Sequence, residues 1–246
     1  MKKHHHQIKK YTSRSHFYKK IRIPKITAES IGLGILLALV GGFLDAYTYI
    51  SRDGVFATSQ TGNLVLLGVE SAQGHWDQGW RHIPPIAAFV LGVMVAEGLK
   101  HPRVLKTFPF PARTVLVLEA IVLISVGTWP ETVPNSIVTI VIAFVSSVQI
   151  SSFRTLVKWQ FNSAMVTGNM RTAAEAAYIV FILRNRESLT KFIDFTVIIG
   201  SFLCGALLGT FTTLYFGTKA IWFSSAILLC AILILNANPK TLLKKE

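Results

Sequence analysis

The sequence predicts an all-α, polytopic membrane helix bundle with six full spans plus two re-entrant Thr-Gly-Asn segments, arranged as an inverted 3+3 repeat. Three observations predict this class. First, hydrophobic residues make up 51% of the 246 residues and charged residues only 15%, whereas soluble domains carry about 25% charged residues. Second, the tripeptide Thr-Gly-Asn occurs twice within apolar stretches, at 61–63 and 167–169. Third, short motifs recur in the same order along the two halves of the chain.

The sequence begins with a basic tail over residues 1–28. Nine Lys and Arg lie within the first 25 residues, before the first acidic residue, Glu29, and they account for much of the net charge of +13. Basic segments next to a membrane span bind anionic lipid and keep that end in the cytoplasm. We therefore expect a disordered cytoplasmic tail rather than an arm that binds nucleic acid.

Six apolar runs are predicted to span the membrane, and the first has about 20 residues, which matches a hydrocarbon core of about 30 Å. We expect the spans at 31–50, 84–99, 114–129, 135–153, 192–216 and 220–235. Pro84 and Pro85 suit the start of a helix. Trp76 and Trp80, which precede them, suit the membrane interface.

The two halves of the membrane region are similar in sequence. An offset of 106 residues superposes the two Thr-Gly-Asn tripeptides, and an offset of 105 places Leu39 on Phe144. With a few residues inserted, the pattern Phe-x-x-Gly-x-x-x-Ala from Phe89 falls on Phe-x-x-Gly-x-x-x-Gly from Phe202, and such small residues suit close helix contact in lipid. The chain therefore divides into the tail over 1–28, a first membrane repeat over 29–130, a second over 131–237 and a basic cytoplasmic C-terminus over 238–246.

The loop charges indicate how the two halves are related. If both Thr-Gly-Asn segments crossed the membrane fully, there would be eight spans, and the basic loop 100–113 would lie outside, against the positive-inside rule. If each segment instead enters the membrane and returns to the side from which it came, the basic loops 100–113 and 154–191 are cytoplasmic and the acidic turn 130–134 is outside. We expect the second arrangement. Three spans per half make the second half an inverted copy of the first, as in many transporters.

These motifs resemble one known family. Gly-Phe-Leu-Asp-Ala at 42–46, Thr-Gly-Asn-Leu at 61–64 and the second Thr-Gly-Asn after Gln149 resemble the YoaK family of bacterial membrane proteins, over about residues 30–236. The resemblance implies a multi-pass cytoplasmic-membrane protein of a family with no established function. It also implies the sequence Gln-Asn-Ala at positions 149–151, where this chain has Gln-Ile-Ser. Ile150, the counterpart of Asp45 in the second half, therefore stands where the resemblance implies a polar residue.

The Thr-Gly-Asn segments are the first candidates for a binding site. Thr caps helices, Gly allows a bend and close backbone approach, and Asn offers both a donor and an acceptor. If half-helices begin at Gly62 and Gly168, their positive ends meet near the midplane, where they can hold an anion or a file of water. The alternative is that the tripeptides only pack against neighbouring helices. The candidate solute-binding residues are Gln60, Thr61, Gly62, Asn63, Thr167, Gly168 and Asn169.

Asp45, Gln149 and Arg171 join this candidate set. A carboxylate within a span is typical of proton or cation coupling; the alternative for Asp45 is a position near the outer interface, paired with Arg52 or the region of Asp53. Arg171 can present its charge to an anion, or it can pair with Glu175 four residues along the same helix face.

The sequence contains no motif of a known enzyme class, such as GxSxG, HExxH, a phosphate loop or a dinucleotide fingerprint. Cys204 and Cys230 form no metal-binding or disulfide pattern. We therefore predict a non-enzyme without cofactor or metal, a small-solute transporter or channel in the bacterial inner membrane, whose partners are the lipid bilayer and a small polar or anionic solute. The alternative is a non-transporting scaffold or sensor whose basic tail binds anionic lipid or a partner. The sequence leaves the oligomeric state open.

Overall fold

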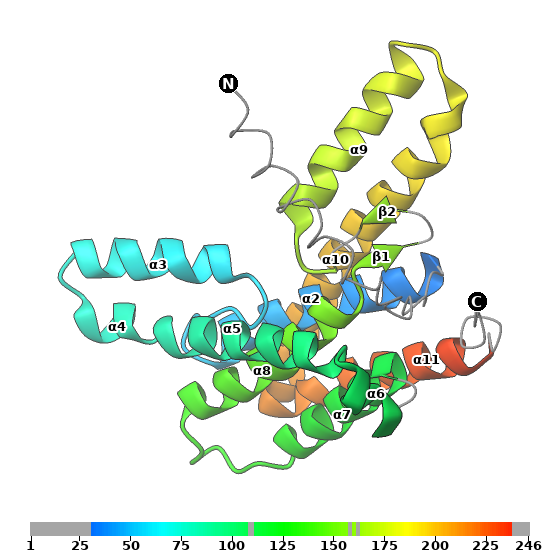
Figure 1. Cartoon of the computed structure of the whole chain (residues 1–246). Helices are drawn as coiled ribbons and strands as arrows, with labels where there is room; N and C mark the ends of the chain where they lie inside the picture. Colours follow the sequence, from blue (N-terminus) through cyan, green and yellow to red (C-terminus); the bar gives the residue numbers. More distant parts are fainter. Residues whose placement is uncertain (1–30, 108–110, 157–158, 161–162, 238–246) are drawn as a thin grey trace, which may run out of the picture.

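The computed structural model describes residues 31–107, 111–156, 159–160 and 163–237, so the basic segments expected at 1–28 and 238–246 lie outside the described residues. Most of the described residues are helical, which fits a helical membrane bundle (Figure 1). In chain order the helical elements are α2 (Ile31–Ser51), α3 (Gln60–Ala72), α4 (Trp76–Trp80), α5 (Ile83–Leu99), α6 (Pro102–Thr107), α7 (Pro111–Val126), α8 (Asn135–Ser152), α9 (Val166–Phe181), η2 (Arg186–Ser188), α10 (Leu189–Phe216), η3 (Gly217–Ala220) and α11 (Ile221–Ala237). Between α8 and α9 lies an antiparallel hairpin of two short strands, β1 (Thr155–Leu156) and β2 (Trp159–Gln160), which the sequence did not predict.

Local sequence explains where the long helices begin and end. α2 is apolar for most of its 21 residues and ends just before Asp53 and Gly54, both of which have positive φ. α5 carries Pro84 and Pro85 in its first turn, where a proline loses no helical hydrogen bond. α10 runs for 28 residues and ends at Gly217, whose φ of 58° favours a residue without a Cβ.

Four helical stretches of the described chain are long and apolar enough to cross a membrane: Ile31–Ser51, Trp76–Leu99, Asn135–Ser152 and Arg186–Leu233. The last stretch contains most of two long helices, α10 and α11, separated by the turn η3. α7, which was also expected to span, has 16 residues, or about 24 Å at 1.5 Å per residue. It packs in the bundle against both α8 and α11.

The two Thr-Gly-Asn segments form shorter helices. α3 has 13 residues and α9 has 16, which correspond to about 20 and 24 Å, less than a hydrocarbon core of about 30 Å. In Figure 1 each of them extends away from the middle of the bundle beside the helix that follows it. α3 packs against α4 and α5, and α9 packs against α10, where the rings of Phe181 and Phe192 meet edge to face.

Long helices from one half of the chain pack against long helices from the other half. α10 lies along α2, and α5 lies along α8. A Cβ placed on Gly205 of α10 would lie 2.0 Å from the carbonyl oxygen of Leu39 in α2. A Cβ placed on Gly92 of α5 would lie 2.6 Å from the carbonyl oxygen of Phe144 in α8. Glycine is required at both crossings because the backbones touch.

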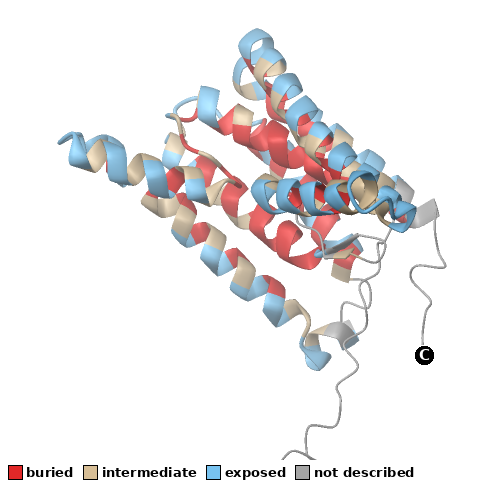
Figure 2. Ribbon diagram, turned by 90° about the horizontal axis from the view of Figure 1, so that it is seen from above, coloured by how far each residue is buried: buried red, intermediate tan, exposed pale blue. Residues whose placement is uncertain are grey.

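The buried core lies where α2, α7, α8 and α11 meet. It is built from aliphatic and aromatic side chains such as Leu37, Phe43, Leu116, Ile142 and Leu228. Figure 2 shows the buried residues gathered in the middle of the bundle, whereas the projecting helices are largely exposed. Many large apolar side chains lie on those exposed surfaces, and extensive exposed apolar surface marks contact with a membrane or another protein.

A polar cluster joins the end of α2 to α8 and to the turn after α10. Arg52 is buried and donates hydrogen bonds of 3.0 Å to the side chains of Asn135 and Tyr47. The Tyr47 hydroxyl donates in turn to the carbonyl of Thr218 over 2.9 Å. These bonds hold three separate segments together at one end of the bundle.

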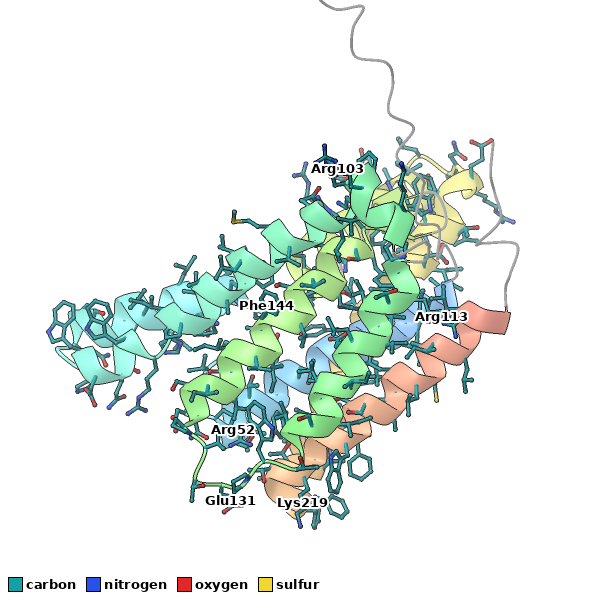
Figure 3. The ribbon with its side chains drawn as sticks, turned by 60° about the horizontal axis from the view of Figure 1, so that its bottom comes forward. Arg52, Arg103, Arg113, Glu131, Phe144 and Lys219 are labelled. Carbon is teal, nitrogen blue, oxygen red and sulfur yellow. The ribbon has the colours of Figure 1, made fainter. Side chains whose placement is uncertain are left out.

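Charged residues mark the two ends of the bundle. Figure 3 places Arg52, Glu131 and Lys219 at one end and Arg103 at the other, with Phe144 between them. Glu131 belongs to the loop between α7 and α8, and Arg103 belongs to α6. The part between these ends is mostly apolar, as the membrane-embedded part of a bundle must be.

Candidate functional site

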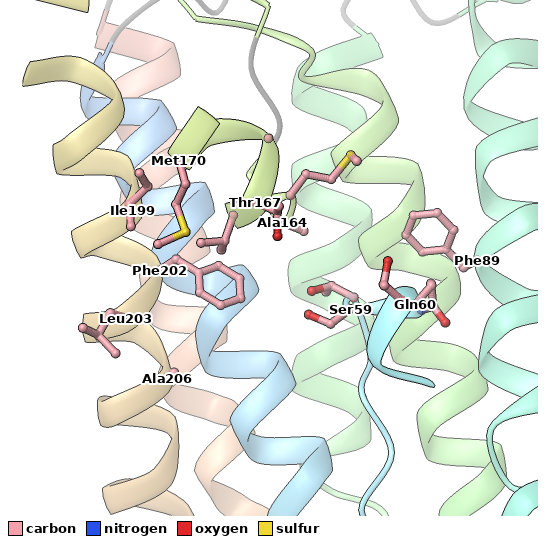
Figure 4. Close-up of a pocket in the computed structure, with 15 residues that line it drawn as sticks. Ser59, Gln60, Phe89, Ala164, Thr167, Met170, Ile199, Phe202, Leu203 and Ala206 are labelled. Carbon is pink, nitrogen blue, oxygen red and sulfur yellow. The ribbon is translucent and has the colours of Figure 1, made fainter. Parts of the chain in front are cut away.

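A cavity of about 680 Å³ lies between the first turns of α3 and α9 (Figure 4). Ligand pockets usually have volumes of about 300–1,000 Å³. Its walls come from residues 58–61 at the start of α3, residues 164–168 and Met170 at the start of α9, Phe89 of α5 and one face of α10. Both Thr-Gly-Asn segments therefore contribute to one cavity.

The two Thr-Gly-Asn tripeptides differ in their surroundings. Thr61 and Thr167 both line the cavity. Gly168 lines it as well, and a Cβ placed there would meet nothing within 4 Å. A Cβ placed on Gly62 would instead lie 2.8 Å from the ring of Phe56. The first glycine therefore makes room for a neighbouring ring, and the second leaves the cavity open.

The side chain of Asn63 fastens the loop that precedes α3. Its Oδ1 accepts from the backbone N–H of Phe56 over 2.9 Å, and its Nδ2 donates to the Phe56 carbonyl over 2.8 Å and to Oε1 of Gln60 over 2.9 Å. Nδ1 of His82 lies 3.2 Å from the same Oδ1. Asn63 is 0% exposed and Asn169 is 4% exposed, so both asparagines are buried. The amide of Asn63 is thus used within the protein.

Asp45 of α2 fastens the same loop from the other side. Its buried carboxylate accepts from the N–H of Thr58 over 2.6 Å and from the Thr58 hydroxyl over 2.8 Å. It also accepts from the N–H of Ser59 over 3.3 Å and from the Ser59 hydroxyl. We call these four bonds the Asp45 clamp. They lie at the N-terminus of α3, where negative charge is favourable. The alternative pairing with Arg52 is wrong, because Arg52 lies seven residues further along the chain, just after the end of α2, and donates to Asn135 and Tyr47 instead.

The second repeat replaces every side chain of the Asp45 clamp. Ile150, the counterpart of Asp45, is buried. The counterparts of the two hydroxyl residues are Ala164 and Met165. The carboxylate and its hydroxyl partners are thus all replaced by apolar side chains in the second repeat, which agrees with the rule that a buried polar side chain needs a partner. Each repeat therefore contributes a cavity wall with a different chemistry.

The remaining candidates take separate positions. Gln60 lines the cavity, and its Nε2 donates to the carbonyl of Ala57 over 2.9 Å. Gln149 is buried within α8, and its Nε2 has no hydrogen-bond partner in the described part of the chain. Arg171 is exposed and pairs with Glu175 over 2.9 Å, as their spacing on one helix face predicts. The described wall of the cavity contains neither Gln149 nor Arg171.

The sequence profile of a family described as "Protein of unknown function (DUF1275)" matches residues 33–234. The chain belongs to this family. It is 25% identical over 143 residues to the "UPF0700 transmembrane protein YoaK" of Bacillus subtilis (strain 168), and the match covers 57% of this chain and 64% of that relative. The match therefore spans just under two thirds of the relative's length. No solved structure matches the chain significantly. The resemblance to the YoaK family is confirmed, and the chain is a multi-pass membrane protein.

Some residues around the cavity were not predicted as site residues. Phe89 of α5 and Phe202 of α10 both line it, and they are the two residues that the repeat alignment superposes. The alignment was therefore a usable signal for them. Thr58 and Ser59 were missed because no local pattern shows that their loop reaches Asp45.

The cavity wall is uncharged over the residues that the structure describes. Within the same residues, no group of three His, Cys, Asp or Glu is placed to hold a metal ion. Glu119 of α7 is buried in a different place, where it accepts from the hydroxyl of Ser146 over 3.4 Å. The chemistry offered at the described wall is hydrogen bonding and apolar contact.

Proposed function

We propose that this membrane protein moves a small solute across the bacterial inner membrane, as a transporter or channel and without catalysing a reaction, through the cavity between α3 and α9. One observation carries the proposal: the first turns of both Thr-Gly-Asn helices line a single cavity. Non-helical backbone at membrane depth is costly in lipid and is tolerated where it is buried in protein or lines a water-filled space. Two such breaks at one cavity favour a path for a polar molecule.

The proposal includes six spans and two re-entrant segments arranged as an inverted repeat. In this repeat α2 corresponds to α8, α5 to α10 and α7 to α11. The α2–α10 contact therefore corresponds to the α8–α5 contact, and the α2–α11 contact corresponds to the α8–α7 contact. All four contacts are made. The glycine crossings support the same relation. Gly205 meets Leu39, and Gly92 meets Phe144. The sequence offsets pair Gly205 with Gly92 and Leu39 with Phe144.

Both termini are cytoplasmic in this arrangement. Loop 130–134 is outside and the basic loop 100–113 is inside, in agreement with the positive-inside rule. The separation of Glu131 and Lys219 from Arg103 along the bundle supports placing their loops on opposite sides of the membrane (Figure 3). α3 then enters from outside and α9 from the cytoplasm, and the cavity between them lies near the midplane, where transporters built from inverted repeats bind their substrates.

Solute uptake into proteoliposomes tests the proposal. The purified full chain is reconstituted, and uptake of a panel of labelled small solutes is compared with uptake by protein-free liposomes. Gly168 lines the cavity and the space around it is open, so the variant Gly168→Leu brings a bulky side chain to the cavity wall. We expect Gly168→Leu to reduce uptake of every transported solute to the protein-free rate.

Gly98→Leu is the matched control for this experiment. Gly98 of α5 also has open space around it, but it does not belong to the described cavity wall. Equal uptake by Gly168→Leu and wild-type protein, at equal incorporation, would overturn the site. If the wild-type protein moves no solute of the panel, and deletion of residues 1–25 alters the cellular phenotype, the scaffold or sensor hypothesis is favoured.

A further inference from the structure

The cavity has two walls of different chemistry, one from each repeat. The wall at the start of α3 is polar over residues 58–61. The opposite wall, from α9 and α10, is mostly apolar: Met165, Met170, Ile199, Phe202 and Leu203. Figure 4 shows side chains of both kinds around the same space. A ligand that fits both walls has one polar side and one apolar side.

The polar wall offers acceptors more than donors. The hydroxyls of Thr58 and Ser59 donate their protons to the carboxylate of Asp45. A hydroxyl has one proton, so these two oxygens keep only acceptor lone pairs for a ligand. Nε2 of Gln60 already donates one proton to the carbonyl of Ala57. A ligand that donates hydrogen bonds therefore satisfies this wall better than one that only accepts them.

A charged ligand finds no counter-charge in the described cavity wall. The carboxylate of Asp45 lies behind that wall, and it accepts four hydrogen bonds from residues 58 and 59 at the positive end of α3. The carboxylate and the helix end thereby compensate each other. Moving an ion from water into an apolar site without a partner is strongly unfavourable.

We infer that this cavity takes a small uncharged molecule with a hydrogen-bond donor, such as an amide or an alcohol, joined to a compact apolar body. The donor meets the side-chain oxygens of the polar wall, which include that of Thr61, and the apolar body lies against Met170 and Phe202. A volume of about 680 Å³ holds a leucine-sized body with room to spare. The role of this ligand as a transported substrate rests on the proposed function, but its binding does not.

Four small amino-acid derivatives test this inference by isothermal titration calorimetry on the full chain in detergent, at slightly acidic pH. N-acetyl-leucinamide is uncharged and has both an amide donor and an isobutyl body. N-acetyl-leucine is its anionic counterpart, leucinamide its cationic counterpart, and N-acetyl-glycinamide lacks the apolar body. We expect saturable binding of N-acetyl-leucinamide and at least about tenfold weaker binding of the other three. N-acetyl-glycinamide loses the burial of an isobutyl group, which alone accounts for that factor, and the two charged derivatives would bring an ion into the cavity without a counter-charge.

Two variants connect the binding to the cavity. Gly168→Leu is expected to abolish binding of N-acetyl-leucinamide, and Gly98→Leu to preserve it. If Gly168→Leu does not fold, as judged by size-exclusion chromatography, Thr61→Val replaces it. Thr61→Val removes one hydroxyl from the wall without changing its size, and a lost hydrogen bond lowers affinity about three- to tenfold.

The outcomes separate this inference from the transport proposal. Tighter binding of N-acetyl-leucine or leucinamide than of N-acetyl-leucinamide overturns the inference and leaves transport standing. No binding of any derivative at millimolar concentration, or equal binding by Gly168→Leu and Gly98→Leu, overturns it as well. The expected selectivity without uptake in proteoliposomes supports the inference and counts against transport.

Discussion

Asp45 and Asn63 show how polar side chains are kept in the interior of this membrane protein. Both are buried, and both bind the loop that precedes α3. An unpartnered polar group is costly in an apolar interior, and lipid offers it no water as a substitute. The asparagine of the first tripeptide therefore closes a loop, while Thr61 reaches the cavity. Fixing the loop also fixes the polar wall of the cavity.

Asp45→Asn should destabilise the protein. The amide has the size of the carboxylate, but its NH₂ group brings donors to a place where Thr58 and Ser59 already supply four. A buried donor left without an acceptor costs about 1–3 kcal/mol. We expect a lower unfolding temperature than that of wild-type protein, measured by circular dichroism in detergent.

Glu97→Gln is the matched control for the Asp45 variant. It makes the same chemical change at an exposed carboxylate, which pairs with Lys100 over 2.5 Å. Exposed pairs contribute about 0–1 kcal/mol, so this variant should unfold close to the wild-type temperature. Equal unfolding temperatures for Asp45→Asn and wild-type protein would show that the Asp45 clamp does not hold the loop.

At the scale of secondary-structure elements, the close crossing of α10 and α2 depends on glycine. Gly205→Ala would place a Cβ 2.0 Å from the carbonyl oxygen of Leu39, and a backbone oxygen cannot move aside without moving its helix. We expect Gly205→Ala to lose most of the monodisperse protein in size-exclusion chromatography.

The same helix provides a control for this substitution. Gly200 also lies in α10, and a Cβ placed there would meet nothing within 4 Å. Gly200→Ala should be as stable as wild-type protein or more stable, because alanine favours the helix by up to about 1 kcal/mol. Similar chromatographic profiles for Gly200→Ala and Gly205→Ala would contradict the close crossing.

Helix bounds were largely predictable because an apolar run of fixed length has few other uses in a membrane protein. The spans expected at 31–50 and 135–153 correspond to α2 and α8 within one residue at each end. α7 begins three residues earlier than expected, at Pro111, which suits a first helical turn. The hairpin after α8 has two paired residues in each strand, too few for an alternating pattern to appear.

The cavity residues were predictable only in part. Thr61 and Thr167 stood out because a polar break in an apolar run is unusual, and both line the cavity. The sequence could not show that Asn63 turns away from it, because the direction of a side chain in the first helical turn depends on how the loop closes. Met170 also lines the wall, but an apolar residue in a membrane protein carries no sequence signal of its own unless a repeat alignment points to it, as it does for Phe202.

At the scale of the whole molecule, neither half buries its long helices by itself. α10 of the second half covers α2 of the first, and α5 of the first half covers α8 of the second. The cavity lies at this junction, between the first turns of α3 and α9. In the proposed inverted repeat, rigid-body movement of one half against the other would therefore change access to the cavity.

The inverted arrangement predicts on which side of the membrane each loop lies. Single cysteines are introduced as His75→Cys and Arg103→Cys, in protein whose own Cys204 and Cys230 are replaced by serine. The stretch Trp76–Leu99 lies between the two positions and is long and apolar enough to cross the membrane. We expect a membrane-impermeant maleimide to label His75→Cys in intact spheroplasts, and Arg103→Cys only after permeabilisation.

A third position, Glu131→Cys, tests the shorter helix α7, whose 16 residues cover about 24 Å. Glu131 lies in the loop that follows α7, and three spans in the first half require it on the same side as His75. Labelling of Glu131→Cys in intact spheroplasts would support the crossing of α7, because position 103 lies on the other side. If Glu131→Cys instead reacts only after permeabilisation, like Arg103→Cys, then α7 does not cross. The first half would then have two spans, α8 would start from the cytoplasm, and the second half would be a parallel copy of the first.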